Sequence, residues 1–225
     1  PTPNPLVTAT LRNLEAALPK AAASDSAFLV AWRTPGINKG LDGRVLDADG
    51  QLLTPVTTVV PAVAPGLATP ADVASDGSGF ALTYNAGGSV RVVTVTDTLA
   101  AGGNAPIAST TNASTRPRIA WDGAHYVVAY RSNGTGAVLR VDPSASPIGP
   151  PSILATTPYI DIACRVGDCL VLQKSPNLTG QPIIDGLPVG PPYDIPGADA
   201  VEIEASIGEY HVFSPGSWTP TPLFG

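Results

Sequence analysis

The sequence predicts an all-β protein, a five-bladed β-propeller whose last blade is closed by the N-terminal strand. Three observations lead to this prediction. The chain is rich in residues that interrupt helices, with 23 Gly and 25 Pro among 225 residues. A short motif recurs five times along the chain. Its copies follow one another at the distance that a four-stranded propeller blade requires.

The composition favours many short strands joined by tight turns. Gly and Pro interrupt helices, while the abundant Val and Thr suit the pleated surface of a sheet. With 44% hydrophobic residues, a chain of 225 residues can bury a sizeable core. Its formal net charge of −6 provides no basic surface for a phosphate backbone. Nucleic acid is therefore not an expected partner.

The recurring motif consists of a small-residue turn, an aromatic residue and an apolar run. It reads AASDSAFLVAW, VASDGSGFALTY, IAWDGAHYVVAY, IACRVGDCLVLQ and IEASIGEYHVFS. The motif is typical of a β-hairpin, because a polar turn separates two apolar strands. A third strand and a less distinct fourth strand are expected before the next copy. The anchor positions, which are 52, 46, 43 and 41 residues apart, are Phe28, Phe80, Tyr126, Cys169 and Tyr210.

We therefore expect a single domain, residues 1–225, that contains five blades. The last copy of the motif leaves little room after it, so we expect the segment 1–17 to complete the last blade as a strand. This arrangement would remove open sheet edges. The stretch TLRNLEAAL within that segment also has helical propensity, which leaves a short helix as the alternative. The expected blades span about 18–68, 69–114, 115–157, 158–198, and 199–225 together with 1–17.

The only two cysteines are predicted to form a disulfide across a hairpin. In the alignment of the repeats, Cys164 takes the position of Trp121, and Cys169 takes that of Tyr126. Directly opposed residues of antiparallel strands have Cα atoms roughly 4.5 to 5.5 Å apart, which a disulfide can bridge. A redox or zinc site would need a two-residue spacing or further ligands. The pair therefore predicts an oxidising compartment: outside the cell, on its surface, or in the periplasm.

The sequence predicts no membrane span. Its longest apolar stretch, LLTPVTTVVPAVAPGLA, contains three prolines and is expected to form a soluble β segment. The chain begins at Pro1 and has no methionine. We therefore expect a mature or excised piece from which an initiator residue and a leader have been removed.

Two copies of the motif resemble a known class of repeat. PRIAWDGAHYVVAY and PADVASDGSGFALTY, followed by strands such as GRVLDADGQLL, are similar to the propeller repeats of large secreted proteins of Gram-negative bacteria. The resemblance extends over residues 17–214 and implies the architecture without implying an activity. The fourth and fifth copies depart from it, since they have no Asp-Gly turn and the fourth has Cys in place of the aromatic pair.

One charged residue precedes the small apolar residues of each first strand. The first strand of a blade lines the central channel, so these residues are expected to form a ring. We interpret the ring as structural, because alternating charges pair and remain ionised. The alternative follows from a resemblance to five-bladed glycosidases, which place three carboxylates around a sugar; Asp72, Asp161 and Glu202 would take that role. The ring residues are Lys20, Asp72, Arg118, Asp161 and Glu202.

Other candidate sites are few. The sequence has no nucleophile elbow, metalloprotease motif or phosphate-binding loop, so we predict no enzyme, no cofactor and no metal. The sequence DADG at 47–50 is interpreted as a hairpin turn and not as a calcium loop. Trp218 is expected to be an exposed aromatic contact. Sequons at Asn112, Asn133 and Asn177 lie in predicted loops, where they would matter in a eukaryotic secretory host.

Three classes of function remain open at this point. The expected function is a non-catalytic extracellular or cell-surface module for adhesion or assembly, which would bind protein or glycan at the cell surface or in the extracellular matrix. A glycan-binding lectin similar to the tachylectin-type five-bladed propellers is the first alternative, and it would need similar pockets in successive blades. A propeller glycosidase is the second alternative.

Overall fold

The computed structural model describes residues 19–34, 40–61, 69–109, 116–156, 159–174, 177–195, 202–206, 209–214 and 217–224. These residues form strands and turns. None of them belongs to a helix that is long and apolar enough to cross a membrane. The fold class is all-β, as the sequence predicts.

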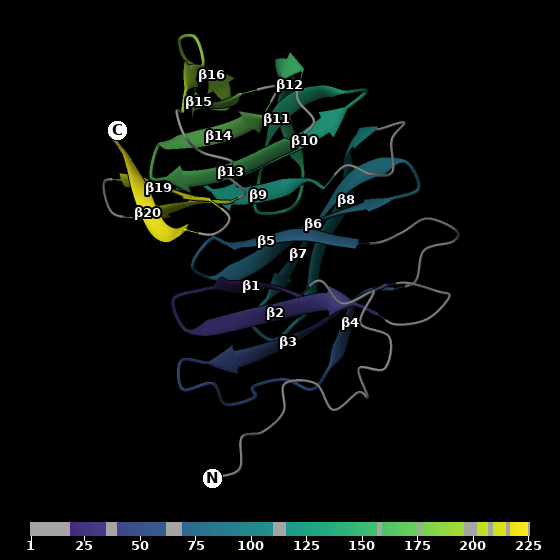
Figure 1. Cartoon of the computed structure of the whole chain (residues 1–225). Coiled ribbons are helices and arrows are strands. Elements are labelled where there is room, and N and C mark those ends of the chain that lie inside the picture. Colours follow the sequence, from purple (N-terminus) through teal and green to yellow (C-terminus); the bar gives the residue numbers. More distant parts are fainter. Residues whose placement is uncertain are drawn as a thin grey trace.

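In the described residues the strands form five antiparallel sheets, which we call A to E in chain order (Figure 1). Sheet A contains β1 (Lys20–Ala23), β2 (Ala27–Arg33), β3 (Leu41–Asp47) and β4 (Thr57–Val60). Sheet B contains β5 (Thr69–Ser75), β6 (Gly79–Ala86), β7 (Ser89–Thr96) and β8 (Ala101–Ser109). Sheet C contains β9 (Arg118–Trp121), β10 (Tyr126–Ser132), β11 (Thr135–Val141) and β12 (Pro147–Thr156).

The last two sheets are less regular. Sheet D contains β13 (Tyr159–Arg165), β14 (Asp168–Lys174), β15 (Leu178–Ile184), β16 (Leu187–Pro188) and β17 (Tyr193–Asp194). The two short strands β16 and β17 pair with opposite ends of β15. Sheet E contains β18 (Glu202–Ser206), β19 (Glu209–Ser214) and β20 (Ser217–Phe224).

Each sheet starts with its inner strand and runs outward as a meander. The inner strands β1, β5, β9, β13 and β18 pack against one another in this order. The turns from first to second strand therefore lie together at one end of the sheets, on the left in Figure 1, which we call the turn face. The first strands begin and the second strands end at the opposite end of the sheets, which we call the crossover face.

The hydrophobic core lies between consecutive sheets. Between sheets A and B, Leu29 and Ala31 of β2 pack with Phe80, Leu82 and Tyr84 of β6. Similar clusters of buried side chains lie between sheets B and C, C and D, and D and E. The strand β6 is buried along its whole length because it packs on both faces. This double burial explains why its sequence, GFALTYNA, does not alternate simply between apolar and polar residues.

The polar turns of the motif are stabilised by their aspartates. The Oδ1 atom of Asp76 accepts hydrogen bonds from the backbone N–H groups of Ser78 and Gly79, both at 2.8 Å. Asp47 plays the same part in the DADG sequence, where its Oδ1 accepts from the N–H groups of Asp49 at 3.0 Å and Gln51 at 2.7 Å. These carboxylates hold the turn in shape and leave the DADG sequence as a hairpin turn.

The structure confirms the predicted disulfide. Cys164 and Cys169 are bonded and lie directly opposite each other in the pair of β13 and β14. In sheet C the equivalent positions hold Trp121 and Tyr126, whose ring centroids are 4.8 Å apart. The disulfide therefore occupies the place of a cross-strand aromatic pair.

Several predictions concern residues that the structure does not describe. The segment 1–17 and Asn112 are not among the described residues. Trp218 lies in β20, but its side chain is not described. The closing N-terminal strand and the exposed aromatic contact therefore stay predictions. Asn133 occupies a two-residue hairpin turn with Gly134, in which their φ angles are 53° and 83°.

We predict that the disulfide is dispensable for the fold. It closes a short loop, so the chain-entropy estimate of its contribution is about 2 kcal/mol, a fraction of the 5 to 15 kcal/mol typical of a domain. A double variant, Cys164→Ala with Cys169→Ala, should fold and lose about 2 kcal/mol of unfolding free energy in urea. Reduced wild-type protein is the control and should show the same loss. A double variant that does not fold at room temperature would contradict this expectation.

Candidate functional site

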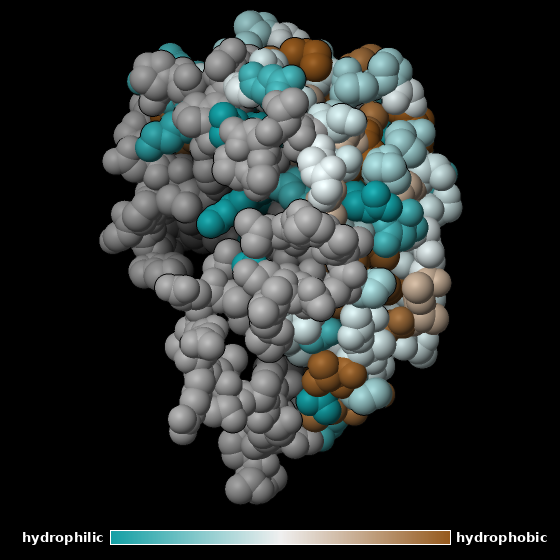
Figure 2. All heavy atoms as spheres, turned by 90° about the vertical axis from the view of Figure 1, so that its right-hand side faces the viewer, coloured by the Kyte–Doolittle hydropathy of each residue, from teal (hydrophilic) through white to brown (hydrophobic). Residues whose placement is uncertain are grey.

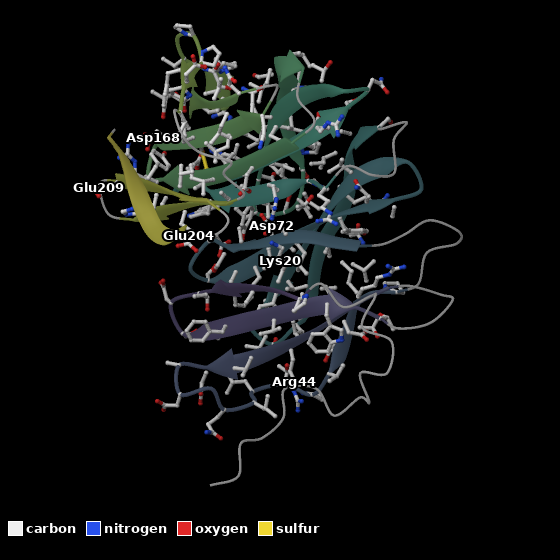
Figure 3. The ribbon with its side chains drawn as sticks, viewed as in Figure 1. Lys20, Arg44, Asp72, Asp168, Glu204 and Glu209 are labelled. Atoms are coloured by element: carbon white, nitrogen blue, oxygen red, sulfur yellow. A yellow bond between two sulfur atoms is a disulfide. The ribbon has the colours of Figure 1, made fainter. Side chains whose placement is uncertain are left out.

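The charged residues of the inner strands form the first candidate site. Lys20 begins β1 and its Nζ lies 3.8 Å from Oδ1 of Asp72 in β5. Arg118 begins β9 and its Nε lies 3.4 Å from Oδ1 of Asp161 in β13. Figure 3 shows Lys20 and Asp72 beside each other in the middle of the molecule. Glu202 begins β18, but its side chain is not described.

The two aspartates also bond to the backbone of the sheet that follows them. Oδ2 of Asp72 in sheet B accepts a hydrogen bond of 3.1 Å from the N–H of Ile119 in sheet C. Oδ2 of Asp161 in sheet D accepts one of 3.2 Å from the N–H of Ile203 in sheet E. The Oδ1 atom of Asp161 accepts from the N–H of Ile162 at 3.0 Å. Each carboxylate thus joins two neighbouring sheets.

Burial dominates the electrostatics of this site. Desolvation raises the pKa of Asp161 to about 6, although Arg118 opposes the rise. Desolvation also raises the pKa of Asp72, against the opposing charges of Arg118 and Lys20. The sequence interpretation held that the cations keep both acids ionised. That reasoning was incomplete, because it did not include the cost of removing a carboxylate from water.

A second group of polar residues was missed by the sequence analysis. Arg33, Asn85, Arg131 and Lys174 all stand five residues after the motif anchors and end the second strands of sheets A to D, or lie within two residues of the end. They lie at the crossover face. Figure 2 shows this face, where several hydrophilic side chains of the described residues lie near the middle of the view. Their constant offset from the anchors was the signal that could have identified them.

A cavity of about 190 Å³ lies between sheets C and D. Arg140 of β11 and Asp185 of the β15–β16 turn lie on its wall, with Nη1 and Oδ1 3.5 Å apart. Ser152 of β12 donates a hydrogen bond of 2.8 Å from Oγ to the carbonyl of Gly186. The side chain of Leu187, which is 60% exposed, and Pro150 add apolar surface. This cavity was not predicted, because its walls come from two different repeats.

No protein-family profile matches the chain, and no curated protein matches it in sequence. Solved structures share its fold. AofleA from Arthrobotrys oligospora aligns with a TM-score of 0.60 and 13% identity, over 90% of this chain and 66% of that chain. One of two prolyl endopeptidases aligns with a TM-score of 0.54 and 13% identity, over 92% of this chain and 35% of that chain. An endo-arabinanase of glycoside hydrolase family 43 from Bacillus licheniformis aligns with a TM-score of 0.47 and 14% identity, over 91% of each chain.

This chain has the architecture of a β-propeller, because its five antiparallel sheets pack against one another through their first strands in chain order. The identities are so low that the likeness concerns the fold alone. The neighbours nevertheless correct one prediction. The sequence analysis excluded an enzyme, but solved structures of this fold include a prolyl endopeptidase and a putative 6-phosphogluconolactonase from Bacteroides fragilis. The second aligns with a TM-score of 0.53 and 12% identity, over 86% of this chain and 66% of that chain. The fold is therefore compatible with catalysis, and the absence of a known catalytic motif does not exclude an enzyme.

We predict that Asp161 makes the stability of the protein depend on pH. Its pKa of about 6 in the folded state lies above the value of about 3.9 for an unfolded aspartate, so the folded state binds the proton more tightly. The unfolding free energy should therefore fall as the pH rises from about 4 to about 6. Relative to the Asp161→Asn variant, wild-type protein should lose about 2 kcal/mol over this range. Urea unfolding of both proteins measures the difference, and a constant difference would contradict the expectation.

Proposed function

We propose that this chain is an extracellular or cell-surface binding module, with the periplasm as the other compartment that its disulfide suits. The observation that carries the proposal is the cavity between sheets C and D. It combines a guanidinium, a carboxylate and a hydroxyl group with apolar surface, within about 190 Å³. Pockets for small molecules usually measure roughly 300 to 1,000 Å³, so this cavity suits one small unit of a larger ligand.

A sugar unit of a glycan is the ligand we favour for this cavity. Sugar hydroxyl groups need both donors and acceptors, which Arg140 and Asp185 supply together. The carboxylate of Asp185 is 83% exposed at the side chain, so it is available to a ligand from solvent. Asp185 and Gly186 adopt φ angles of 53° and 75°, which fix the tight hairpin that carries this carboxylate. Adhesion to surface glycans, or assembly within a surface structure, is the role this proposal implies.

The proposal predicts that Arg140 is required for glycan binding. A glycan array with the whole chain should identify a bound sugar, and Arg140→Ala should weaken that binding at least tenfold, since a charge-assisted hydrogen bond is lost. Arg44→Ala is the matched control. Arg44 lies in β3, away from the cavity, where its Nε donates to the carbonyl of Thr54 at 3.0 Å. Equal binding by both variants would contradict the proposed site.

A propeller glycosidase is the second candidate, and the raised pKa values of Asp161 and Asp72 favour it. Glycoside hydrolysis needs one carboxyl group that stays protonated near neutral pH and a second that is ionised. Glu202 would be the third carboxylate in this proposal. Release of reducing sugar from plant and bacterial polysaccharides tests it. Activity that is lost in Asp161→Asn and in Asp72→Asn, while both variants stay folded, would favour hydrolysis over binding alone.

We also propose that the five sheets are the five blades of one closed domain, residues 1–225. The packing of successive inner strands from β1 to β18 supports a ring. Sheet E has three described strands, which leaves a place for one more. In this proposal, residues 1–17 fill that place and the blades keep the boundaries expected from the repeats.

A further inference from the structure

Arg33 is a buried arginine at the junction of sheets A and B. It is the last residue of β2 and pairs with Leu41 of β3. Because side chains alternate along a strand, Arg33 lies on the same face as Leu29 and Ala31, which pack against sheet B. Only 8% of its surface is exposed. Its guanidinium group therefore lies between the sheets, at the crossover face.

The guanidinium of Arg33 lacks partners within the described part of the chain. Its Nε and Nη2 atoms are buried and have no hydrogen-bond partner there. Desolvation lowers its pKa from the ordinary arginine value, and no nearby acid opposes this. The hydroxyl oxygen of the adjacent Thr34 is likewise buried without a partner among the described residues. An arginine stays charged in a protein, so this site has a buried positive charge that an anion would stabilise.

Two acids of the two sheets, Asp42 and Asp72, have other partners. Asp42 is the neighbour of Leu41, but it pairs with Trp32 and so lies on the opposite face of sheet A. There its Oδ1 accepts a hydrogen bond of 3.0 Å from Thr58. Asp72 is engaged by Lys20 and by the N–H of Ile119. Across the junction, sheet B presents a further cation, Arg91, whose Nε lies 3.3 Å from the hydroxyl of Tyr84.

The positions equivalent to Arg33 differ from it. Asn85, Arg131 and Lys174 end the corresponding strands of sheets B, C and D, or lie next to their ends, and each has an interaction partner. Arg33 differs from the others in this set, because its Nε and Nη2 atoms have no hydrogen-bond partner among the described residues. The junction of sheets A and B thus contains a guanidinium group with two N–H donors that no described residue of the chain engages.

Another arginine in this chain indicates what the missing partner would be. Arg165 binds Asp168 side-on, with Nε donating to Oδ1 at 3.0 Å and Nη2 donating to Oδ2 at 2.6 Å. Nε and Nη2 are the two nitrogens that have no partner in Arg33. Their N–H bonds are parallel, and their spacing matches the two oxygens of a carboxylate.

We propose that Arg33 binds the carboxylate group of a ligand side-on, at the junction of sheets A and B on the crossover face. The positive charge of Arg91 supports the site from sheet B. The carboxylate comes from a uronic acid unit of an acidic glycan or from a free small carboxylate, which share this chemistry. The site is separate from the cavity between sheets C and D, so it does not depend on the function proposed for that cavity.

The test measures the thermal unfolding midpoint of the whole chain with glucuronate, acetate, glucose or sulfate at constant ionic strength. Wild-type protein should be stabilised by glucuronate and not by glucose. Stabilisation by acetate as well would identify a free carboxylate as sufficient, whereas a response to glucuronate alone would identify the sugar acid. Stronger stabilisation by sulfate than by either carboxylate, or no response to any carboxylate, would overturn the proposal.

Variants of Arg33 separate binding from a structural role. Arg33→Met should bind glucuronate at least tenfold more weakly in calorimetry. Arg33→Lys should retain only part of the affinity, because it keeps the positive charge but lacks the two parallel N–H donors of the guanidinium group. Arg44→Met is the matched control, since Arg44 lies in the same sheet and already has a partner; it should bind as wild type does. Without ligand, Arg33→Met should unfold at or above the wild-type temperature, because it removes an unpaired buried charge. A lower midpoint would show that Arg33 serves the fold and would overturn the proposal.

Discussion

The arrangement of the sheets depends on polar contacts that cross from each inner strand to the next. Among the described residues, adjacent sheets share no strand ladder of hydrogen bonds. Their strands meet mainly through apolar side chains, which give little directional preference. Lys20 joins sheet A to Asp72 in sheet B, and Asp72 joins sheet B to the backbone of Ile119 in sheet C. Arg118 and Asp161 repeat this sequence from sheet C to sheets D and E. The alternation of cation and acid along the chain therefore corresponds to one polar contact between successive inner strands at each junction.

The same contacts determine the acid–base properties of the site. A carboxylate between two sheets is desolvated on both sides, and this raises the pKa of Asp161 to about 6 even though a guanidinium lies beside it. A group that serves as a structural link thus also titrates close to neutral pH. Structural and catalytic interpretations of these aspartates are not exclusive in physical terms, because burial between sheets produces both properties.

The sequence predicted the features that depend on one repeat and missed those that depend on two. The hairpin of Cys164 and Cys169 could be aligned with Trp121 and Tyr126, because opposed positions within a hairpin follow from the repeat itself. The raised pKa of Asp161 could not be predicted from one repeat, since it depends on how closely sheet E covers sheet D. The cavity beside Arg140 could not be predicted either, because its opposite wall begins at Asp185 in the next repeat.

Arg33, whose Nε and Nη2 have no partner among the described residues, shows the same division more sharply. In sequence, Arg33 and Asp42 are close enough to suggest an ion pair. The register of β2 and β3 places Asp42 opposite Trp32, one position away from the partner of Arg33, and a shift of one residue puts a side chain on the other face.

The two faces of the molecule also use their charges differently. On the turn face, aspartates such as Asp76 and Asp122 are occupied by the backbone N–H groups of their own turns. The turns fix the geometry of these carboxylates in sheets B and C. On the crossover face, the equivalent positions carry Arg33, Asn85, Arg131 and Lys174, which differ in charge, length and donor number. These two turns are alike, whereas the unlike residues at the equivalent crossover positions make each junction distinct. Recognition of a single ligand requires such a distinct junction, and both ligand sites that we propose lie where two neighbouring sheets meet.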